Sequence, residues 1–178
     1  MFSGYTPDLI GDLKIRWERL QQRVRQTGAD GLIVGTNVNL LYLSGRIFMG
    51  YVYLPAEGAP WFFVRRPCGL TGPNVIEIRK PEQLPEILCG AGAALPKTLL
   101  LEGDDLTFSE WTRLGAVFAG TTVSNGSGLL RQSRSIKTPY EIRVMKRTGS
   151  RHADVVSRFA SVYEPGMTDQ ACRSRCFG

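Results

Sequence analysis

The sequence contains little of what hydrolytic centres are usually built from. His152 is its only histidine. One imidazole cannot both act as the base for a Ser or Cys nucleophile and bind a metal ion. A two-metal centre needs several carboxylates converging on ions about 4 Å apart, and scattered acids with one histidine cannot supply them. Helix-spaced apolar residues surround His152, which favours a packed or surface role. We therefore expect no catalytic residue and no metal site in this chain.

Long apolar segments are also missing. No apolar run approaches the roughly 18 residues that span a bilayer, and residues 1–12 lack the basic region and apolar core of a signal peptide. The four cysteines lie far apart except for Cys172 and Cys176, and no second pair of metal ligands accompanies these two. We expect reduced thiols, a cytoplasmic location and no membrane partner.

The net charge of +6 is confined to one end of the chain. Residues 1–130 hold 12 basic and 12 acidic residues, whereas residues 131–178 hold 10 basic and 4 acidic ones. A basic tail can bind nucleic acid, but here the basic side chains alternate with helix-spaced apolar residues and have no aromatic stacking platform. A solvated helix face is the favoured interpretation, and we expect no nucleic-acid partner.

Helical and strand patterns alternate regularly over the first 134 residues. Apolar runs bounded by turn residues predict strands at 31–35, 51–54, 61–64, 75–78, 98–102 and 121–124. Apolar residues at helical spacing predict helices at 12–27, 37–45, 81–91 and 107–119. The first of these helices is expected to be capped by Asp12 and stopped by Gly28, and the last to turn Phe108, Trp111, Leu114 and Phe118 inward. Residues 125–128 are expected to form a loop, after which residues 129–134 lead into a hinge.

These patterns predict an α/β fold, a mixed six-stranded sheet with helices on both faces, over residues 1–134. An apolar fraction of 43% and a charged fraction of 21% suit one soluble domain of this size. Residues 135–178 are predicted to be a C-terminal helical extension. The order of the strands does not follow from the sequence.

The extension opens with a strong helix start. Thr138 and Glu141 have the spacing of a capping box, and Pro139 between them suits the first helical position. Asp169 is expected to cap a second helix. The first helix carries an apolar stripe with no predicted partner in the chain, through which we expect self-association: Ile142, Met145, Ala153, Val156, Ala160 and Tyr163.

Three groups of residues resemble landmarks of the pita-bread metallopeptidases, which are the Xaa-Pro dipeptidases, aminopeptidases P and creatinases. The first is A-D-G at 29–31 with the matching positions Asn39, Tyr42, Leu43, Ser44 and Gly45. The second runs from Arg134 to Lys146 and includes I-K-T-P-Y-E-I at 136–142, and the third is P-G-M-T-D at 165–169. The resemblance implies that 1–134 is a creatinase/prolidase-type N-terminal domain and that 135–178 is the hinge with the first helices of a catalytic domain.

The resemblance also implies where the chemistry of such a protein lies. In the family two divalent ions (Mn, Co or Zn) are held by two aspartates, a histidine and two glutamates, all beyond the hinge, and the substrates are proline-containing peptides. The acids of this chain beyond residue 130 are Glu141, Asp154, Glu164 and Asp169, which do not provide that set. We expect the chain by itself to hold no cofactor and to be inactive, although the resemblance implies that it comes from a larger parent protein that is a metal-dependent peptidase.

One functional segment is expected within the first domain. The resemblance implies that the loop after the Y-L-S-G motif reaches the active site of a neighbouring subunit in a homodimer and shapes its substrate pocket. Here Arg46 can meet a peptide carboxylate, and Phe48 and Tyr51 can wall a proline pocket. In the competing interpretation Phe48 and Tyr51 are ordinary strand aromatics and Arg46 is a solvated turn residue.

Two alternative functions remain open at this point. The chain can be a stand-alone protein-binding module of the same fold, or the N-terminal domain of a creatinase-like amidinohydrolase. The coding sequence beyond codon 178 separates the peptidase from the binding module: ligand-bearing Asp, His and Glu motifs there select the peptidase, and their absence selects the module. A creatinase-like parent would need different loop residues.

Overall fold

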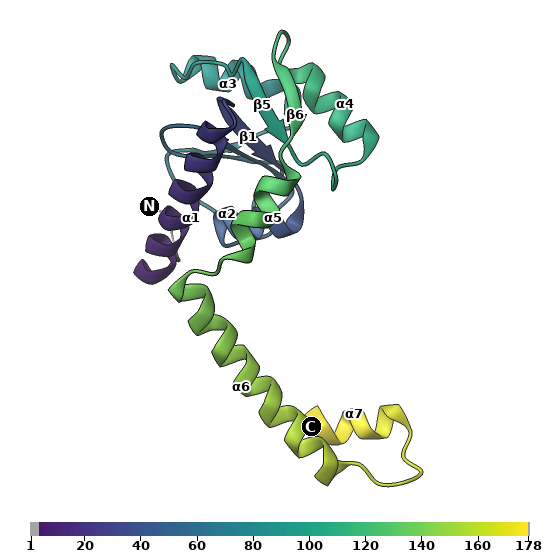
Figure 1. Ribbon diagram of the computed structural model, residues 1–178. Helices are drawn as coiled ribbons and strands as arrows, with labels where there is room; N and C mark the ends of the chain where they lie inside the picture. The colour runs from purple at the N-terminus through teal and green to yellow at the C-terminus, as the bar shows by residue number, and fades with distance from the viewer. Residues whose placement is uncertain (1–3, 178) are drawn as a thin grey trace. The chain divides into compact units, whose positions relative to one another are not determined.

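The computed structural model describes residues 4–177, without the side chains of residues 160, 176 and 177. The chain forms two compact units, Met1–Ile136 and Lys137–Gly178 (Figure 1). The first unit contains every strand found in the described part of the chain. The second contains two helices.

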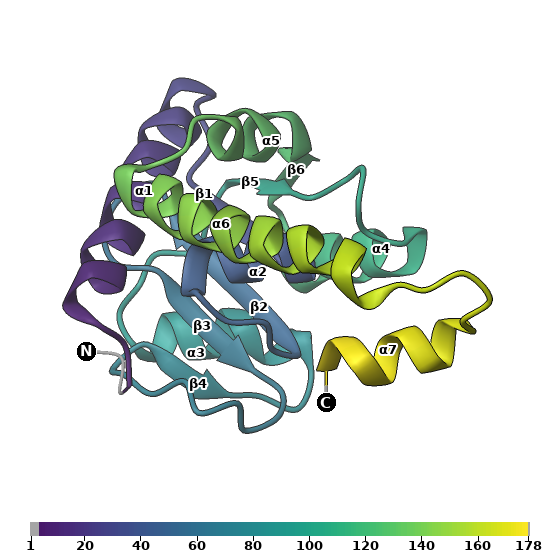
Figure 2. The ribbon, with the colours of Figure 1, turned by 90° about the horizontal axis from the view of Figure 1, so that it is seen from below.

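The first unit is built on a six-stranded sheet with the order β4-β3-β2-β1-β5-β6, which Figure 2 shows from one edge to the other. β1 pairs antiparallel with β2, and β2 with β3, whereas the β1–β5, β5–β6 and β3–β4 pairs are parallel. The predicted mixed six-stranded sheet is confirmed. Its strands are β1 (Gly31–Val34), β2 (Gly50–Pro55), β3 (Trp61–Val64), β4 (Val75–Glu77), β5 (Thr98–Leu101) and β6 (Thr122–Asn125).

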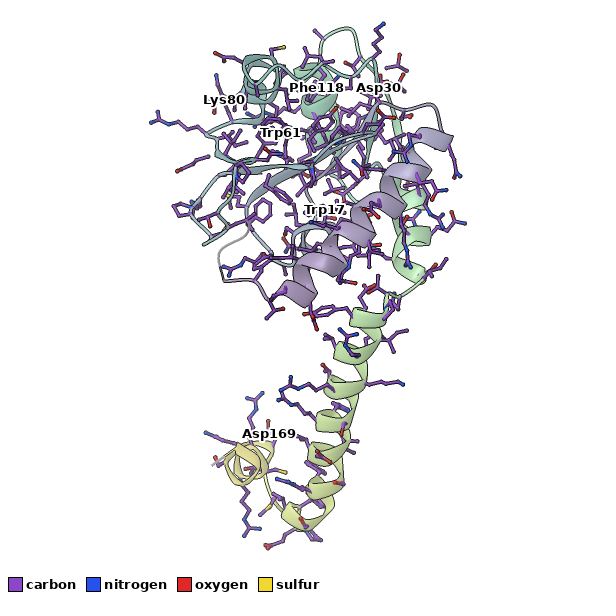
Figure 3. The ribbon with its side chains drawn as sticks, turned by 90° about the vertical axis from the view of Figure 1, so that its left-hand side faces the viewer. Trp17, Asp30, Trp61, Lys80, Phe118 and Asp169 are labelled. Carbon is purple, nitrogen blue, oxygen red and sulfur yellow. The ribbon has the colours of Figure 1, made fainter. Side chains whose placement is uncertain are left out.

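Helices cover both faces of this sheet, as predicted. One face carries α1 (Pro7–Gln26), α2 (Asn37–Ser44) and α5 (Ser127–Ser135). The other carries the 3₁₀ turn η1 (Pro81–Gln83), α3 (Leu84–Gly90) and α4 (Phe108–Val117). In Figure 3 Trp17 lies on the α1 side of the sheet, and Trp61 and Phe118 lie on the other side.

Strand alternation divides the apolar side chains between two cores. Successive residues of a strand point to opposite faces, so Leu32 and Val34 join the core under α1 while Ile33 joins the core under α3 and α4. Phe62 and Phe63 divide in the same way. Because both faces of the central strands are buried, β1, β3 and β5 are nearly continuous apolar runs, which is why they are recognisable in the sequence.

The start of α1 differs from the prediction. The helix begins at Pro7 and its cap is Thr6, whose hydroxyl accepts a hydrogen bond from the Leu9 amide at 3.3 Å. Asp12 is therefore not a cap: it is buried within α1 and forms an ion pair with Arg16, one turn later. Thr6 followed by Pro7 and Asp8 is the stronger start because proline and an early acid both suit a first turn. The predicted stop holds, since Gly28 has φ +74°.

Two further predictions were wrong. Phe108 was expected inside, but as the first residue of α4 it is 85% exposed, and Leu114 and Phe118 carry the packing with partial burial of Trp111. Residues 125–128 were expected to be a loop before a lead into the hinge, but α5 begins at Ser127 and runs to Ser135, so residues 127 and 128 are helical. Gly126, Ser127 and Gly128 resemble loop residues, and the helix gains its stability from burying Leu130 rather than from propensity.

The second unit consists of α6 (Pro139–Val162) and α7 (Asp169–Phe177). The predicted capping box starts α6: the Glu141 amide donates to Thr138 Oγ1 at 3.1 Å, and the Thr138 amide donates to Glu141 Oε2 at 2.9 Å. The cap of α7 is Thr168 rather than Asp169, because Thr168 Oγ1 accepts from the Ala171 amide at 3.2 Å. Neither these helices nor any other in the described residues is long and apolar enough to cross a membrane.

Two glycine-to-alanine substitutions are predicted to change stability in opposite directions. Gly50 has φ +153°, and a Cβ there would lie 1.9 Å from the Phe63 carbonyl oxygen, so Gly50→Ala should cost about 3 kcal/mol or more. Gly11 lies within α1, where a Cβ would meet no described atom within 4 Å, so Gly11→Ala should stabilise by about 0.5–1 kcal/mol. Urea denaturation measures both; a Gly50→Ala protein as stable as the wild type would contradict the β2 geometry.

Candidate functional site

The loop between α2 and β2 has a fixed path. Gly45 ends α2 with φ +71°, and the Ser44 hydroxyl accepts a hydrogen bond from the Arg46 amide at 3.1 Å. The Tyr5 hydroxyl donates to the Ser44 carbonyl at 2.6 Å. The L-S-G end of the first motif is thus a helix stop that sets the direction of the loop.

Arg46 is held against neighbouring segments of the first unit. Its guanidinium donates to the Cys68 carbonyl at 2.7 Å and lies 5.5 Å from the centre of the Tyr5 ring. Burial raises the pKa of the Tyr5 phenol, and the Arg46 charge opposes that effect. Arg46 therefore ties the loop to the segment before β4 and to the segment before α1.

Phe48 and Tyr51 lie on opposite faces of the sheet but border one hollow. Phe48 is only 6% exposed and belongs to the core under α1, whereas Tyr51 is half-buried against the other core. Both line a hollow of about 380 Å³ next to the end of β1. Arg46 is not among the residues lining it. The structure thus brings two of the three predicted site residues to one hollow.

The hollow has further lining residues that the sequence interpretation missed. Ile47 and Met49 are 56% and 50% exposed, because burial of Phe48 between them directs its neighbours outward. Arg65, Leu106 and Glu110 complete the polar and apolar wall. The alternation I-F-M was the available signal for Ile47 and Met49, whereas the other three come from distant segments and left no local signal.

The charges around Tyr51 affect its ionisation. Burial raises the pKa of the Tyr51 phenol, the Arg65 guanidinium opposes that rise, and the Glu110 carboxylate adds to it. The phenol is therefore a hydrogen-bond donor at neutral pH. A group bound in this hollow would meet one cation, one carboxylate and a neutral hydroxyl.

A second hollow, of about 490 Å³, adjoins this region and shares Leu106 with the first. It is bordered by Phe108, which is almost fully exposed, and by Trp111 and Asn125. Exposed apolar side chains thus gather near the ends of β1, β5 and β6. Open α/β sheets commonly bind ligands or partners at the carboxyl ends of their strands.

Directly behind these hollows lies a buried carboxylate. Glu102 follows β5 and has no exposed surface. Its Oε2 accepts from the amides of Gly35 and Thr36 at 2.6 and 3.0 Å, and its Oε1 accepts from the Thr36 hydroxyl at 2.5 Å. The positive end of the α2 dipole favours a negative charge at this position. The carboxylate thus caps α2 from a different strand.

Two motif residues extend this network. The Asn39 side chain donates to Glu102 Oε1 and accepts from the Arg134 guanidinium. The Tyr42 hydroxyl donates to the Ser133 carbonyl at 3.4 Å, and the Arg16 guanidinium lies 5.1 Å from the Tyr42 ring centre. Asn39 and Tyr42 come from the first motif and Arg134 from the second, so the two motifs meet in space and join α2 to α5.

The described residues do not fit a two-metal centre. They contain no group of three or more His, Cys, Asp or Glu side chains placed to share an ion. The Glu102 carboxylate already accepts four hydrogen bonds. The Asp104 carboxylate accepts hydrogen bonds from Arg131 and Asn125, which lower the pKa of that carboxyl. No step of metal-assisted hydrolysis can be assigned to them.

Replacing Glu102 by glutamine should destabilise the first unit strongly. Both oxygens of Glu102 accept hydrogen bonds, so an amide would place its NH₂ group against other donors in either orientation. We expect Glu102→Gln to lower the free energy of unfolding by about 2–4 kcal/mol. The control is Glu77→Gln on exposed β4, which should change it by less than about 0.5 kcal/mol. Equal stabilities of the two variants in urea titrations would refute the network.

Comparison with known proteins matches this architecture to one family. The model of the Creatinase/Prolidase N-terminal domain matches residues 16–136. No curated protein sequence matches significantly. Among solved structures, the chain is similar to the Xaa-Pro dipeptidase from Bacillus anthracis, with a TM-score of 0.74 and 18% identity over 92% of this chain and 47% of that one.

Two other structures resemble the chain in different ways. Prolidase from Pyrococcus furiosus gives a TM-score of 0.68 and 17% identity over 89% of this chain and 50% of that one. The N-terminal domain of the cytoplasmic peptidase PepQ from Mycobacterium tuberculosis gives 0.52 and 17%, over 67% of this chain and 98% of that one. The chain spans about half the length of the dipeptidase and prolidase it matches. Since the family model covers more than half of its residues, the chain belongs to the creatinase/prolidase N-terminal domain family.

Proposed function

We propose that this chain is the non-catalytic N-terminal part of a cytoplasmic Xaa-Pro dipeptidase or aminopeptidase P-like metallopeptidase. The family and the names of similar structures support this assignment. Residues 1–134 are the N-terminal domain, and residues 135–178 are the hinge and first helices of the catalytic domain. The match to the dipeptidase supports that division. The first unit, Met1–Ile136, is 136 of 178 residues, or 76% of the chain. Because the match covers 92% of the chain, the similarity extends into the second unit.

The role of the N-terminal domain is to shape the substrate pocket of a partner subunit with its loop Arg46–Tyr51. The observation that carries this proposal is the hollow with Ile47 and Met49 exposed at its rim. Exposing two large apolar side chains on a loop is unfavourable in an isolated domain and is typical of a contact surface. Phe48 and Tyr51 form the wall of the hollow, and Arg46 positions the loop through Cys68 and Tyr5.

The chemistry belongs to the rest of the proposed parent. There, two divalent ions (Mn, Co or Zn) would supply the hydrolytic water for proline-containing peptides. This chain contributes binding surface: an apolar wall, the neutral phenol of Tyr51 and the charge of Arg65. A proline ring suits such a wall because it is apolar and rigid, and a peptide carboxylate suits the guanidinium.

Loop variants of the whole protein should raise KM with little change in kcat. An apolar wall of the pocket binds the substrate and the transition state equally, so its removal affects KM rather than kcat. Met49→Ala and Tyr51→Ala should each raise KM for a Gly-Pro dipeptide by roughly tenfold. Leu95→Ala serves as control, because Leu95 is similarly exposed but borders a different hollow. If KM is unchanged in both loop variants, these side chains are structural and the proposed role of the loop is wrong.

The second unit supports a homodimer by a separate observation. α6 exposes large apolar side chains at three- and four-residue spacing, with Phe159 stacked against Tyr163 at 6.2 Å. Leaving such a face in water is unfavourable by about 25 cal/mol per Å². A closed twofold arrangement of two chains would cover it. The exposed side chains of this face are Ile142, Met145, Val156, Phe159 and Tyr163, and Val144 and Val155 are exposed as well.

Charge on this face should prevent self-association of the chain. Val156→Glu or Phe159→Glu places a carboxylate in the proposed contact, so sedimentation at micromolar concentration should show monomer where the wild type shows dimer. Ser157→Glu is the matched control, since Ser157 is exposed on the same helix next to the face, and it should leave the dimer intact. Equal association of all four proteins would place the interface in the first unit.

A further inference from the structure

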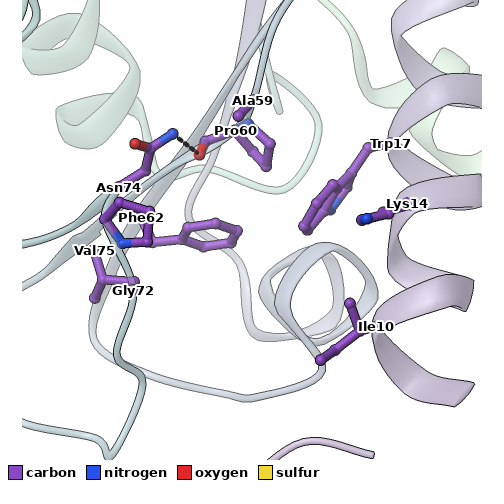
Figure 4. Close-up of a pocket in the computed structure, with 10 residues that line it drawn as sticks. Ile10, Lys14, Trp17, Ala59, Pro60, Phe62, Gly72, Asn74 and Val75 are labelled. Carbon is purple, nitrogen blue, oxygen red and sulfur yellow. Dashed lines mark hydrogen bonds between the residues drawn. The ribbon is translucent and has the colours of Figure 1, made fainter. Parts of the chain in front are cut away.

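A second surface of the first unit is built like a small-molecule site and lies apart from the loop hollow. It is a groove of about 310 Å³ between α1 and the segments that flank β3 (Figure 4). Its floor holds the rings of Trp17 and Phe62, whose centroids are 6.1 Å apart. Ile10, Val75 and two proline rings, Pro60 and Pro73, extend this apolar surface. None of the residues of the loop Arg46–Tyr51 lines it.

The walls of the groove are fixed by hydrogen bonds. The Trp17 indole N–H donates to the Leu43 carbonyl at 2.7 Å, which holds the ring in place. On the opposite wall the Asn74 side-chain amide donates to the Pro60 carbonyl at 3.2 Å (Figure 4). Phe62 is buried to 2% exposure in the core. A groove with walls held in this way is largely formed before a ligand arrives, which lowers the cost of binding.

The charge of the groove selects the ligand. Among the described residues, Lys14 is the only charged one that lines the groove, and Figure 4 shows its side chain beside Trp17. Within the described part of the chain, no acidic side chain forms an ion pair with Lys14. A bound molecule would therefore meet mainly apolar side chains, the Trp17 indole among them, and one cation at the rim.

We propose that this groove binds a small aromatic monocarboxylate, with its ring against the partly exposed Trp17 and its carboxylate at Lys14. Aromatic rings prefer tilted or offset contacts with other rings, and the indole of Trp17, which Phe62 supports from within the core, offers such a contact. The volume lies at the lower end of ligand sites, so it suits a single ring rather than a lipid chain. The inference does not depend on the proposed peptidase parentage.

Ligand-observed NMR titration of the full chain with phenylacetate tests the proposal. We expect saturable binding with a Kd on the order of 1 mM, as suits a ligand of this size. The neutral analogue phenylacetamide should bind at least about fivefold more weakly, and Lys14→Gln should weaken phenylacetate binding to the same extent. Ala59 is exposed and borders both this groove and a neighbouring hollow, and Ala59→Phe should abolish saturable binding by obstructing the groove.

Matched controls make the result decisive. Lys97→Gln and Ala94→Phe change exposed residues on another hollow and should leave binding unchanged. Absence of saturable binding to the wild type, equal binding of acid and amide, or binding that survives Ala59→Phe would each overturn the proposal. Self-association that Ala59→Phe abolishes, in a protein that does not bind phenylacetate, would assign the groove to a second copy of the chain instead.

Discussion

The first unit depends on a buried carboxylate. Glu102 has no contact with solvent, yet it receives hydrogen bonds from two backbone amides, a hydroxyl and a side-chain amide. A buried charge is tolerated only when such donors replace water, and here the donors come from the turn between β1 and α2. One side chain after β5 thus fixes the start of α2 and, through Asn39 and Arg134, the place where α5 docks.

This arrangement gives the motif residues a structural meaning. Asn39 and Tyr42 of the first motif and Arg134 of the second form hydrogen bonds with partners 63 to 95 residues away in the chain. These bonds join α2 to α5 and to the segment after β5. Their hydrogen bonds are used within the fold, so the surface available for binding is provided by their neighbours. Those neighbours are the side chains of the loop after α2 and of the segment after β5.

The sequence predicted local structure well because local structure has local causes. The buried strands are apolar runs of four to six residues, and the capping boxes at Thr107 and Thr138 place their helices correctly. Self-association and the domain division remain predictions. Strand order, by contrast, follows from pairing between distant segments, and α5 is stabilised by burial of Leu130 against α1 and the sheet rather than by its own propensity.

The site was predicted less completely for the same reason. Phe48 and Tyr51 border the predicted hollow, but the direction of the Arg46 side chain depends on Cys68 and Tyr5, which no local pattern reveals. Glu102 resembled the last residue of a strand, and nothing in its surroundings along the chain indicated a cap for α2. Arg65 and Glu110 reach the hollow from other strands and helices, so only the assembled sheet identifies them.

A double-mutant cycle between Asn39 and Arg134 tests most directly the claim that the two motifs serve the fold by contacting each other. The free energies of unfolding of Asn39→Ala, Arg134→Ala, the double variant and the wild type would be measured in urea. Each single variant already breaks the shared hydrogen bond, so the double variant cannot lose it a second time. We therefore expect the double variant to lose about 1–2 kcal/mol less unfolding free energy than the two single variants lose together. Additive losses, with a coupling energy near zero, would contradict it.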